Sequence, residues 1–389
     1  METKIIDNYE DFLKLKPLWD NLLEESDNDL VYLTFEWLQT WWEYFGYGHK
    51  LFVVLIEESK KIIAAAPLMI ENRRIGNLVT LRKLKFIAYE ISDYMDFIAI
   101  RNKKESFDLI FKSVIDNSHL WDAAELFYIP ENSPNLTFWK DSISTLRTFK
   151  KIFSKQDVAV SIDMYRNANN YSELEKVIPS KERIGRVLRK KRSKLLRDKQ
   201  DVVLNRENIS SRIEEDFTHF VDFHKDRWRA KSNGSQFENP AVQKYYLNVA
   251  KKLSERGWFE LASIKSKDDY IAMVYGYIYK GRYYHYISVL NPDYSRYSPS
   301  QLLVRFLLES FYAEGNIKVF DFLRGGELDK YDWSKDELKL YSATIYPAKF
   351  KSFMIYASKK MNDSLFMRLR RIKFLKYLKR ILLDRHKHS

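Results

Sequence analysis

The sequence lacks cysteine altogether, and this absence excludes disulfides, thiolate metal ligands and a cysteine nucleophile. No apolar run approaches the roughly 18 residues that a transmembrane helix requires, and the first residues lack the apolar segment of a secretory signal. Zinc-ligand spacing, a Walker loop and a dinucleotide-binding fingerprint are also missing, and the seven histidines are scattered. These absences predict a cytoplasmic protein that binds no metal.

The composition that remains is that of a folded protein with an uneven charge. Hydrophobic residues make up 45% of the 389 residues and aromatic residues 15%, which is enough for two domains with a core each. The net charge is +13, but residues 348–389 hold thirteen Lys or Arg and only two Asp, so +11 of it lies in this tail. The positive charge therefore does not mark the whole protein as a nucleic-acid binder.

The two halves of the chain repeat one order of patterns. In each half, two β-rich runs flank a short turn and are followed by a third run, a segment with helical apolar spacing and a closing strand. These segments are 51–58, 61–69, 93–100, 104–116 and 124–129 in the first half, and 258–264, 270–276, 282–290, 299–314 and 317–323 in the second. The repeat predicts a duplicated α/β (α+β) domain, each copy a mixed, mostly antiparallel sheet flanked by helices. We expect domains over 1–165 and 166–347, and a basic tail over 348–389.

Short motifs recur in order over most of residues 15–345. They are the aromatic-rich 33–42 with 65–68 and 92–96 in the first half, and the basic 181–197 with 223–228, 281–286, 297–303, 320–325 and 330–333 in the second. In this order the chain resembles the BioF2-like/CelD-type GNAT acetyltransferase family, which is related to the Fem peptidyltransferases. The resemblance implies two tandem GNAT-like domains, with the active site in the second domain.

The resemblance also implies the reaction. Members of this family transfer an acyl group, typically from acetyl-CoA, to an amine or a hydroxyl, and many are linked to cell-envelope or polysaccharide precursors. Two alternatives stay open. The Fem relatives take an aminoacyl group from tRNA, and a degenerate tandem GNAT protein can serve as a non-catalytic, membrane-associated scaffold in glycan assembly.

The start of the predicted helix 299–314 is a candidate donor site. Ser298 as N-cap and Pro299 at the first helical position leave free backbone N–H groups, which together with the helix dipole bind anions. The resemblance places the CoA pyrophosphate here. It assigns cofactor contacts to Arg296, Ser298, Ser300, Gln301 and Arg324. The glycine-bearing loop of standard GNAT enzymes is absent, and an ordinary capped helix is the alternative.

Asp321 and Lys330 are the first catalytic candidates. Asp321 lies in an aromatic strand, where burial is expected to raise its pKa toward the range of a general base. The alternative is that Asp321 pairs with Arg324 or caps a neighbouring loop. Lys330 follows the flexible pair 325–326, and the resemblance implies contact with phosphate or the reacting carbonyl. An exposed loop lysine is the alternative for Lys330.

The strand 282–290 supplies two further catalytic candidates. Because side chains alternate along a strand, Tyr284 and Tyr286 share one face, and Tyr283 and His285 share the other. Tyr286 can donate a proton to a leaving thiolate, and His285 can relay one. Packing of the sheet is the alternative for both residues.

Four residues are candidates for substrate binding. Arg189 lies in the segment 181–199, whose apolar stripe and basic face predict a helix able to hold an anion such as nucleotide phosphates or a tRNA backbone. His224 and Arg227 are three residues apart on the next helix, and Asp93 belongs to the first half. Packing and a solvated basic face are the alternative readings.

The tail completes the predictions. From about residue 363 to 385, leucine and isoleucine recur at three- and four-residue steps between Lys and Arg, which is typical of an amphipathic basic helix. Such a helix binds an anionic membrane surface, with RNA or the protein's own body as alternatives. The prediction is a cytoplasmic protein that attaches peripherally to the inner face of the membrane.

Overall fold

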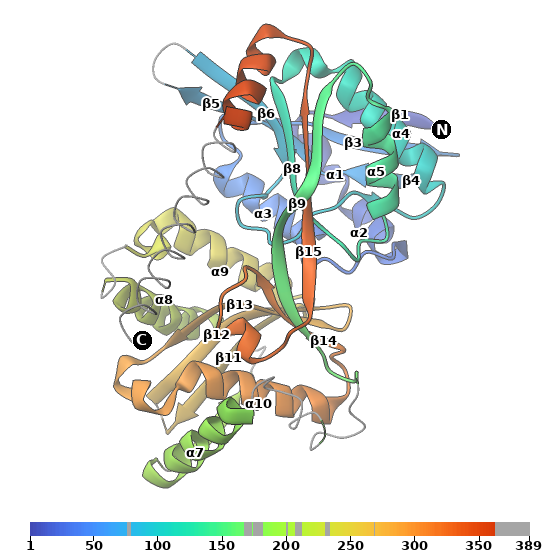
Figure 1. Ribbon diagram of the computed structural model, residues 1–389. Helices are drawn as coiled ribbons and strands as arrows, with labels where there is room; N and C mark the ends of the chain where they lie inside the picture. Colours follow the sequence, from blue (N-terminus) through green and yellow to red (C-terminus); the bar gives the residue numbers. More distant parts are fainter. Residues whose placement is uncertain are drawn as a thin grey trace, which may run out of the picture.

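The computed structural model describes residues 1–75, 79–166, 173, 182–199, 201–206, 212–229, 234–267 and 269–361. Figure 1 shows two lobes, one for each half of the chain, joined by two long strands that run through both. The predicted tail helix over 363–385 lies outside the described residues. Within the described ranges, no helix combines the length and the apolar composition needed to cross a membrane.

The first half holds most of the smaller elements. In order they are β1 (Glu2–Ile6), α1 (Tyr9–Lys14), α2 (Lys16–Glu25), η1 (Val31–Leu33), α3 (Phe35–Phe45), β2 (Lys50–Leu51), β3 (Val53–Glu58), β4 (Lys61–Ala66), β5 (Leu68–Ile75), β6 (Val79–Phe86), β7 (Ile98–Ala99), α4 (Lys103–Asp116), η2 (Ser118–Leu120), β8 (Ala123–Pro130) and α5 (Leu136–Thr145). Pro67 separates β4 from β5. Because proline cannot donate to a strand ladder, the chain leaves one sheet here and enters the other.

The second half begins on the first of the two long strands. Its elements are β9 (Lys150–Asp163), α7 (Glu182–Asp198), β10 (Val202–Asn205), α8 (Ile213–Arg229), η3 (Gln236–Glu238), α9 (Pro240–Ser254), β11 (Phe259–Ser266), β12 (Asp269–Tyr279), β13 (Arg282–Leu290), η4 (Pro292–Tyr297), α10 (Pro299–Glu314), β14 (Val319–Arg324), η5 (Lys330–Asp332) and β15 (Glu337–Tyr346). A last helix spans 350–361.

The strands form two sheets. The larger has eleven strands in the order β10-β11-β12-β13-β14-β9-β15-β8-β6-β5-β2, and the smaller has four in the order β1-β3-β4-β7. Only the pairs β13–β14 and β6–β8 are parallel among the pairings in the described residues. The predicted fold class, a mixed and mostly antiparallel sheet flanked by helices, is therefore confirmed.

The predicted elements match the structure unevenly. The helix 299–314 and the strand 282–290 have the bounds of α10 and β13. The strand expected over 93–100 was wrong in extent, because only Ile98–Ala99 of β7 pairs. The residues before it form a loop whose polar side chains take tertiary partners. Asp96 accepts hydrogen bonds from Ser133, Asn135 and Trp139 side chains.

The domain limits expected at 165 and 347 stay a prediction, and the sheet runs across the first of them. β9 pairs with β14 of the second half near its end, and along most of its length with β15. β15 pairs on its other edge with β8 of the first half. The last strand of the second half thus lies in the sheet of the first (Figure 1).

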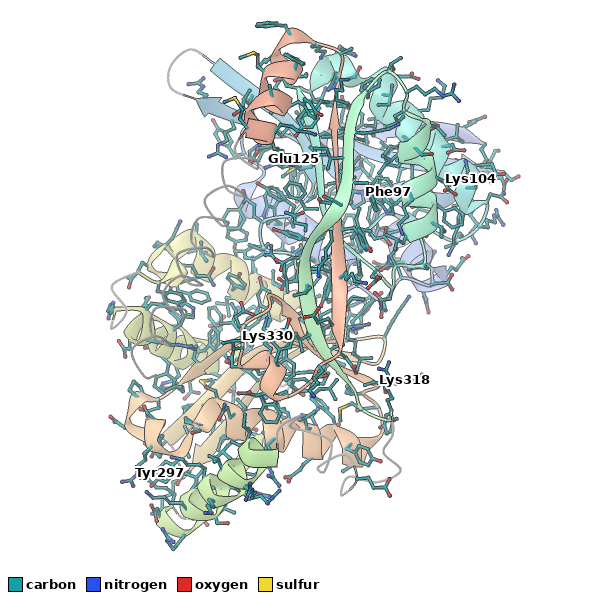
Figure 2. All side chains as sticks on the ribbon, viewed as in Figure 1. Phe97, Lys104, Glu125, Tyr297, Lys318 and Lys330 are labelled. Carbon is teal, nitrogen blue, oxygen red and sulfur yellow. The ribbon has the colours of Figure 1, made fainter. Side chains whose placement is uncertain are left out.

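Two hydrophobic clusters fill the molecule, and the larger one spans both halves. In it, the Phe97 ring of the first half, labelled in Figure 2, lies tilted against Trp139, with ring centroids 4.1 Å apart. The Trp37 ring of α3 meets Tyr277 of β12 edge-on at 5.4 Å. The smaller cluster lies on the other face of the second-half sheet, where α10 and α7 cover it. The larger cluster therefore holds the halves together.

Candidate active site

The parallel strands β13 and β14 separate after a short stretch of pairing. They pair at Arg282–Val319, Tyr283–Phe320 and Tyr284–Asp321, and no further pairing is present between them in the described residues. On the far side of β13, the register with β12 shifts at Gly276, which marks a β-bulge. Two strands that diverge leave main-chain N–H and C=O groups between them available to another molecule.

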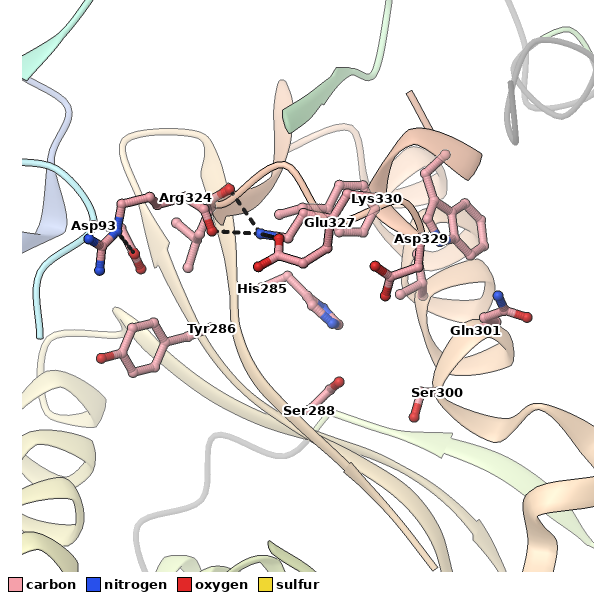
Figure 3. Close-up of a pocket in the computed structure, with 14 residues that line it drawn as sticks. Asp93, His285, Tyr286, Ser288, Ser300, Gln301, Arg324, Glu327, Asp329 and Lys330 are labelled. Atoms are coloured by element: carbon pink, nitrogen blue, oxygen red, sulfur yellow. Dashed lines mark hydrogen bonds and ion pairs between the residues drawn. The ribbon is translucent and has the colours of Figure 1, made fainter. Parts of the chain in front are cut away.

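A cavity of about 410 Å³ opens where the strands diverge. Its walls come from β13, β14, the first turns of α10, the loop leading to η5, and one loop of the first half (Figure 3). The lining residues are Asp93, His285, Tyr286, Ser288, Ser300, Gln301, Val304, Phe322, Leu323, Arg324, Glu327, Asp329, Lys330 and Trp333. Seven of the predicted site residues meet here, since Asp93, His285, Tyr286, Ser300, Gln301, Arg324 and Lys330 are among them.

The start of α10 forms one wall. Ser298 is the N-cap and Pro299 the first helical residue, as predicted, but Ser298 has a left-handed backbone (φ 56°) and its side chain makes no capping hydrogen bond. The Ser300 hydroxyl is buried and has no hydrogen-bond partner. In the first turn the N–H groups of Ser300 and Gln301 have no carbonyl one turn earlier to bind. This wall offers unused donors to an anionic or polar group.

His285 lies on the side of β13 that faces α10. Its ring packs between Phe320 and Phe322, with centroids 5.7 and 5.8 Å away, and its Nδ1 atom is buried without a partner. Burial, with Lys330 nearby, lowers the pKa of His285 to about 3. The imidazole is therefore neutral at physiological pH and can relay a proton only by taking and giving it in turn.

Tyr286 lies on the opposite side of the strand, as the alternation predicted. Its hydroxyl donates to the Ile91 carbonyl at 2.8 Å and lies 3.1 Å from the Tyr246 hydroxyl. Burial raises the pKa of Tyr286 well above its usual value. The phenol is thus tied to the first half of the chain, and a leaving thiolate would have to displace one of these bonds to receive its proton.

Asp93 brings a carboxylate from the first half to the cavity. Arg324 Nε lies 3.2 Å from Asp93 Oδ1, and the Tyr32 hydroxyl donates to Oδ2 at 3.2 Å. The Arg324 guanidinium also lies over the Tyr128 ring, 3.8 Å from its centroid. Burial raises the pKa of Asp93 although the Arg324 charge acts in the opposite direction. A carboxylate of raised basicity thus lines the wall of the cavity.

Lys330 holds the loop that follows β14. Its ammonium donates to the carbonyls of Leu323, Arg324 and Gly325 at 3.2, 2.7 and 3.4 Å, and pairs with Glu327 at 2.9 Å (Figure 3). The alternative of an exposed loop lysine does not apply, because the side chain is only 17% exposed. The structure therefore gives Lys330 a role in shaping the cavity, and a role as electrostatic stabiliser stays a prediction.

Asp321 is fully buried and is not among the residues that line the cavity. Its carboxylate accepts from Tyr94 Oη at 2.8 Å, Arg282 Nη1 at 2.9 Å and Leu323 N at 2.7 Å. Burial raises its pKa, in the expected direction. Of the alternatives, the ion pair with Arg324 does not form, because Arg324 pairs with Asp93 and Arg282 pairs with Asp321, whereas the contact with Leu323 N caps the end of the strand. Asp321 fixes Leu323, whose φ of 65° is unusual for a branched residue.

The other predicted residues lie outside the cavity lining. Arg296 is exposed and lies 3.7 Å from Asp198 of α7, and Arg189 is exposed on α7. His224 is held by Ser235 and Trp228, and burial lowers its pKa to about 4. Arg227 donates to the carbonyl of Ser288 at 3.1 Å and so supports the strand that lines the cavity.

Sequence reasoning missed several lining residues. Ser288 is two residues beyond Tyr286 on the same strand, and period-two alternation could have identified it. Glu327 and Asp329 lie in the loop between two predicted site residues, but no residue pattern in that loop points to a cavity. Among the described residues, no group of His, Asp and Glu side chains has the arrangement of a metal site.

A polar cavity between diverging parallel strands, beside a helix start, fits the GNAT-type site that the resemblance implied. Residues 182–333 match the family described as "Acetyltransferase (GNAT) domain". The second half of the chain therefore contains a GNAT-type acyltransferase domain.

Solved structures share this fold at low sequence identity. FemX has a TM-score of 0.60 and 11% identity, and the match covers 88% of this chain and 97% of FemX. A conserved protein of unknown function from Bacteroides thetaiotaomicron has a TM-score of 0.55 and 10% identity, over 89% and 100% of the two chains. The C-terminal DUF2156 domain of a putative lysylphosphatidylglycerol synthetase from Agrobacterium fabrum has a TM-score of 0.51 and 11% identity, over 90% and 96%. No curated protein sequence matches the chain.

Proposed function

We propose that the protein transfers an acyl group from an acyl-CoA, such as acetyl-CoA, to an amine or hydroxyl of a cell-envelope or polysaccharide precursor. The cavity between β13 and β14 carries the proposal. The pantetheine arm of CoA is an extended chain with two amides, and diverging strand edges offer it main-chain partners as a further strand would. The free N–H groups at the start of α10 suit the pyrophosphate. The Ser300 hydroxyl, which has no hydrogen-bond partner within the protein, supplies a further polar group at the same wall to bind the acyl-CoA.

In this proposal Asp93 is the general base. The acceptor nitrogen or oxygen attacks the thioester carbonyl, its proton passes to the Asp93 carboxylate, and the C–S bond breaks to release the CoA thiolate. The raised pKa of Asp93 makes it a better base than an exposed aspartate. Arg324 keeps the carboxylate oriented, and Lys330 and Asp321 hold the loop that forms the wall.

Thermal-shift titration with acetyl-CoA tests donor binding. A ligand at a hundred times its Kd stabilises the folded state by about 2.7 kcal/mol, so a clear rise in Tm is expected. Ser300→Trp places a large ring at the cavity wall and should abolish this rise. Ser358→Trp, on an exposed position of the last helix, is the matched control and should keep it. No shift with acetyl-CoA or longer acyl-CoAs in the unmodified protein would remove the donor from the proposal.

The second candidate is an aminoacyl-tRNA-dependent transferase of Fem type. The observation that favours it is the basic helix α7, which packs on η4 and on α10, the helix whose first turns line the cavity. Lys190 and Arg197 are exposed there, and Lys191 donates to the carbonyl of Arg296 at the helix start. Stabilisation by charged tRNA instead of acetyl-CoA would select this function. Stabilisation by neither would favour the non-catalytic scaffold.

A further inference from the structure

The helix 350–361 lies on the first half of the chain and is fixed there by one face. Ser352 is fully buried, and the Tyr356 ring packs edge-on against Tyr346 with centroids 5.4 Å apart. Lys359 Nζ donates at 3.2 Å to a threonine hydroxyl of β15. Figure 1 shows the helix at the end of the molecule away from α7 and α10.

The opposite face of this helix is apolar and turned to solvent. Phe350, Phe353, Met354 and Met361 are 82, 55, 53 and 71% exposed. With Ala357 they occupy positions i, i+3, i+4, i+7 and i+11, which form one stripe along a helix. Of the thirteen large apolar side chains exposed in the described ranges, four lie on these twelve residues.

Such a stripe needs a partner. Single exposed apolar residues are common on protein surfaces, but a continuous stripe that faces water is found at contact surfaces. A surface helix ordinarily turns its apolar face to the core. This helix turns serine, tyrosine and lysine inward, so packing on the body does not account for the stripe.

Cations surround the stripe. Lys360 is exposed on the helix. Lys351 donates to the main-chain carbonyl of Thr80 on β6 and pairs with the buried Asp122 at 2.7 Å, so its charge is already offset. Arg74 pairs with Thr80 in the β5–β6 ladder, and both Arg74 and Arg73 are exposed. The chain that continues from the helix is also basic, since +11 of the net charge lies in 348–389. The partner of this surface is therefore apolar and negatively charged.

We propose that the helix 350–361 binds the surface of a bilayer that contains anionic phospholipids. The stripe enters the boundary between headgroups and acyl chains, and the flanking lysines and arginines contact lipid phosphates. A second copy of the chain is a poorer occupant, because placing two stripes together brings the cations of both copies side by side. This inference does not rest on the proposed transfer reaction.

A single-cysteine label tests the placement directly. Because the chain has no cysteine, Met354→Cys in the full-length protein carries an environment-sensitive fluorophore at one position. Vesicles of mixed phosphatidylglycerol and phosphatidylcholine should shift its emission to the blue, and pure phosphatidylcholine should not. Tyr47→Cys, at a fully exposed site of the first half, is the control and should not respond. An unchanged spectrum at position 354 with anionic vesicles would overturn the proposal, as would a label already buried before vesicles are added.

Co-flotation of the full chain provides a second measurement. Replacing Phe350, Phe353 and Met354 by serine removes most of the apolar area that would enter the bilayer. This should weaken partition onto anionic vesicles about tenfold or more. Leu18→Ser, at another exposed apolar site, should change nothing. Unchanged far-UV circular dichroism would show that the triple variant is folded. Equal flotation of variant and parent would assign attachment to the tail alone, and a change from dimer to monomer in the variant would assign the stripe to self-association.

Discussion

Asp93 and Arg324 come from different halves of the chain, and their side chains meet 3.2 Å apart at the cavity wall. The carboxylate is the only acid of the first half that lines this cavity in the described residues. Because burial raises its pKa, Asp93 takes up a proton at a higher pH than an exposed aspartate. The pair therefore joins the two halves at the position where the reaction is proposed.

Asp93→Asn should lower kcat by about 10²- to 10⁴-fold, the usual contribution of a general base. With a hydroxyl acceptor, activity of the parent should rise with pH through the pKa of Asp93, since only the carboxylate accepts the proton. The variant should lose this limb of the pH profile while acetyl-CoA still raises its Tm. Asp329→Asn, in the same cavity, is the control and should keep the limb. A similar fall in both variants would count against Asp93 as base.

Asp96 gives a pH prediction for stability. It is fully buried, and burial raises its pKa to about 6 from a model-peptide value of 3.8. The folded state therefore keeps this proton at pH values where the unfolded chain has released it. This contribution to stability is complete below pH 3.8 and is lost as the pH rises through about 6.

The comparison with Asp96→Asn isolates that contribution. Relative to the variant, the parent should lose about 2 to 3 kcal/mol of unfolding free energy between pH 4 and pH 7. Urea unfolding of both proteins at several pH values measures the difference. A difference that does not depend on pH would mean that Asp96 ionises normally in the folded protein.

At the scale of elements, the bulge between β12 and β13 shapes the cavity strand. Gly276 stands at the register shift, and a Cβ atom there would lie 2.5 Å from the Tyr283 hydroxyl. The ring of Tyr283 is fully buried and cannot move away easily. The glycine is needed for this close approach of strand and ring.

Gly276→Ala should therefore destabilise the protein by about 1–3 kcal/mol, the usual cost of overpacking. In a Tyr283→Leu background, which frees the space, the same substitution should cost less, and a double-mutant cycle measures this coupling. Additive effects of the two substitutions would show that the contact is relieved in another way. Tyr277→Leu, next to Gly276 on β12, is the control background. The cost of Gly276→Ala should persist there, because the Tyr283 ring stays in place.

At the scale of the whole molecule, the halves are joined by strands, core and charges. Lys280 donates to the carbonyls of Leu23, Ser26 and Asn28 at 2.9 to 3.0 Å. Arg282 bridges Asp29 of the first half and Asp321 of the second, at 2.9 Å each. With β15 in the sheet of both halves, separate unfolding would expose a shared core.

Calorimetry should accordingly show one cooperative transition for both halves. Lys280→Ala removes a donor from three carbonyls, of which that of Leu23 keeps the Ser26 hydroxyl, and should lower the unfolding free energy by about 1–3 kcal/mol. Lys104→Ala removes an exposed ammonium that pairs with Asp108 one helical turn along α4, and should change the unfolding free energy little. Two separate transitions in the parent would contradict the shared core.

The repeat, the fold class and the bounds of α10 and β13 were predictable from the sequence, because local periodicity and turn chemistry specify single elements. The long strands β9 and β15 were not predicted as elements. Their residues alternate weakly, and their places in the sheet are set by pairing partners far along the chain. Residues 93–97 were predicted as part of a strand but form a loop. Their polar side chains bond to residues that only the fold brings near, and the local pattern does not reveal these partners.

Local patterns were sufficient to predict a duplicated α/β fold, the Ser298–Pro299 helix start and a basic C-terminal segment, since each of these depends on neighbouring residues. Tertiary structure alone decided which charges meet. In the folded chain Asp321 pairs with Arg282, Arg324 pairs with Asp93, and the ammonium of Lys330 donates to main-chain carbonyls. The tertiary structure also left the stripe of 350–361 facing water. Ion pairs and exposure depend on residues brought together from distant positions, and a pattern within one segment does not contain that information.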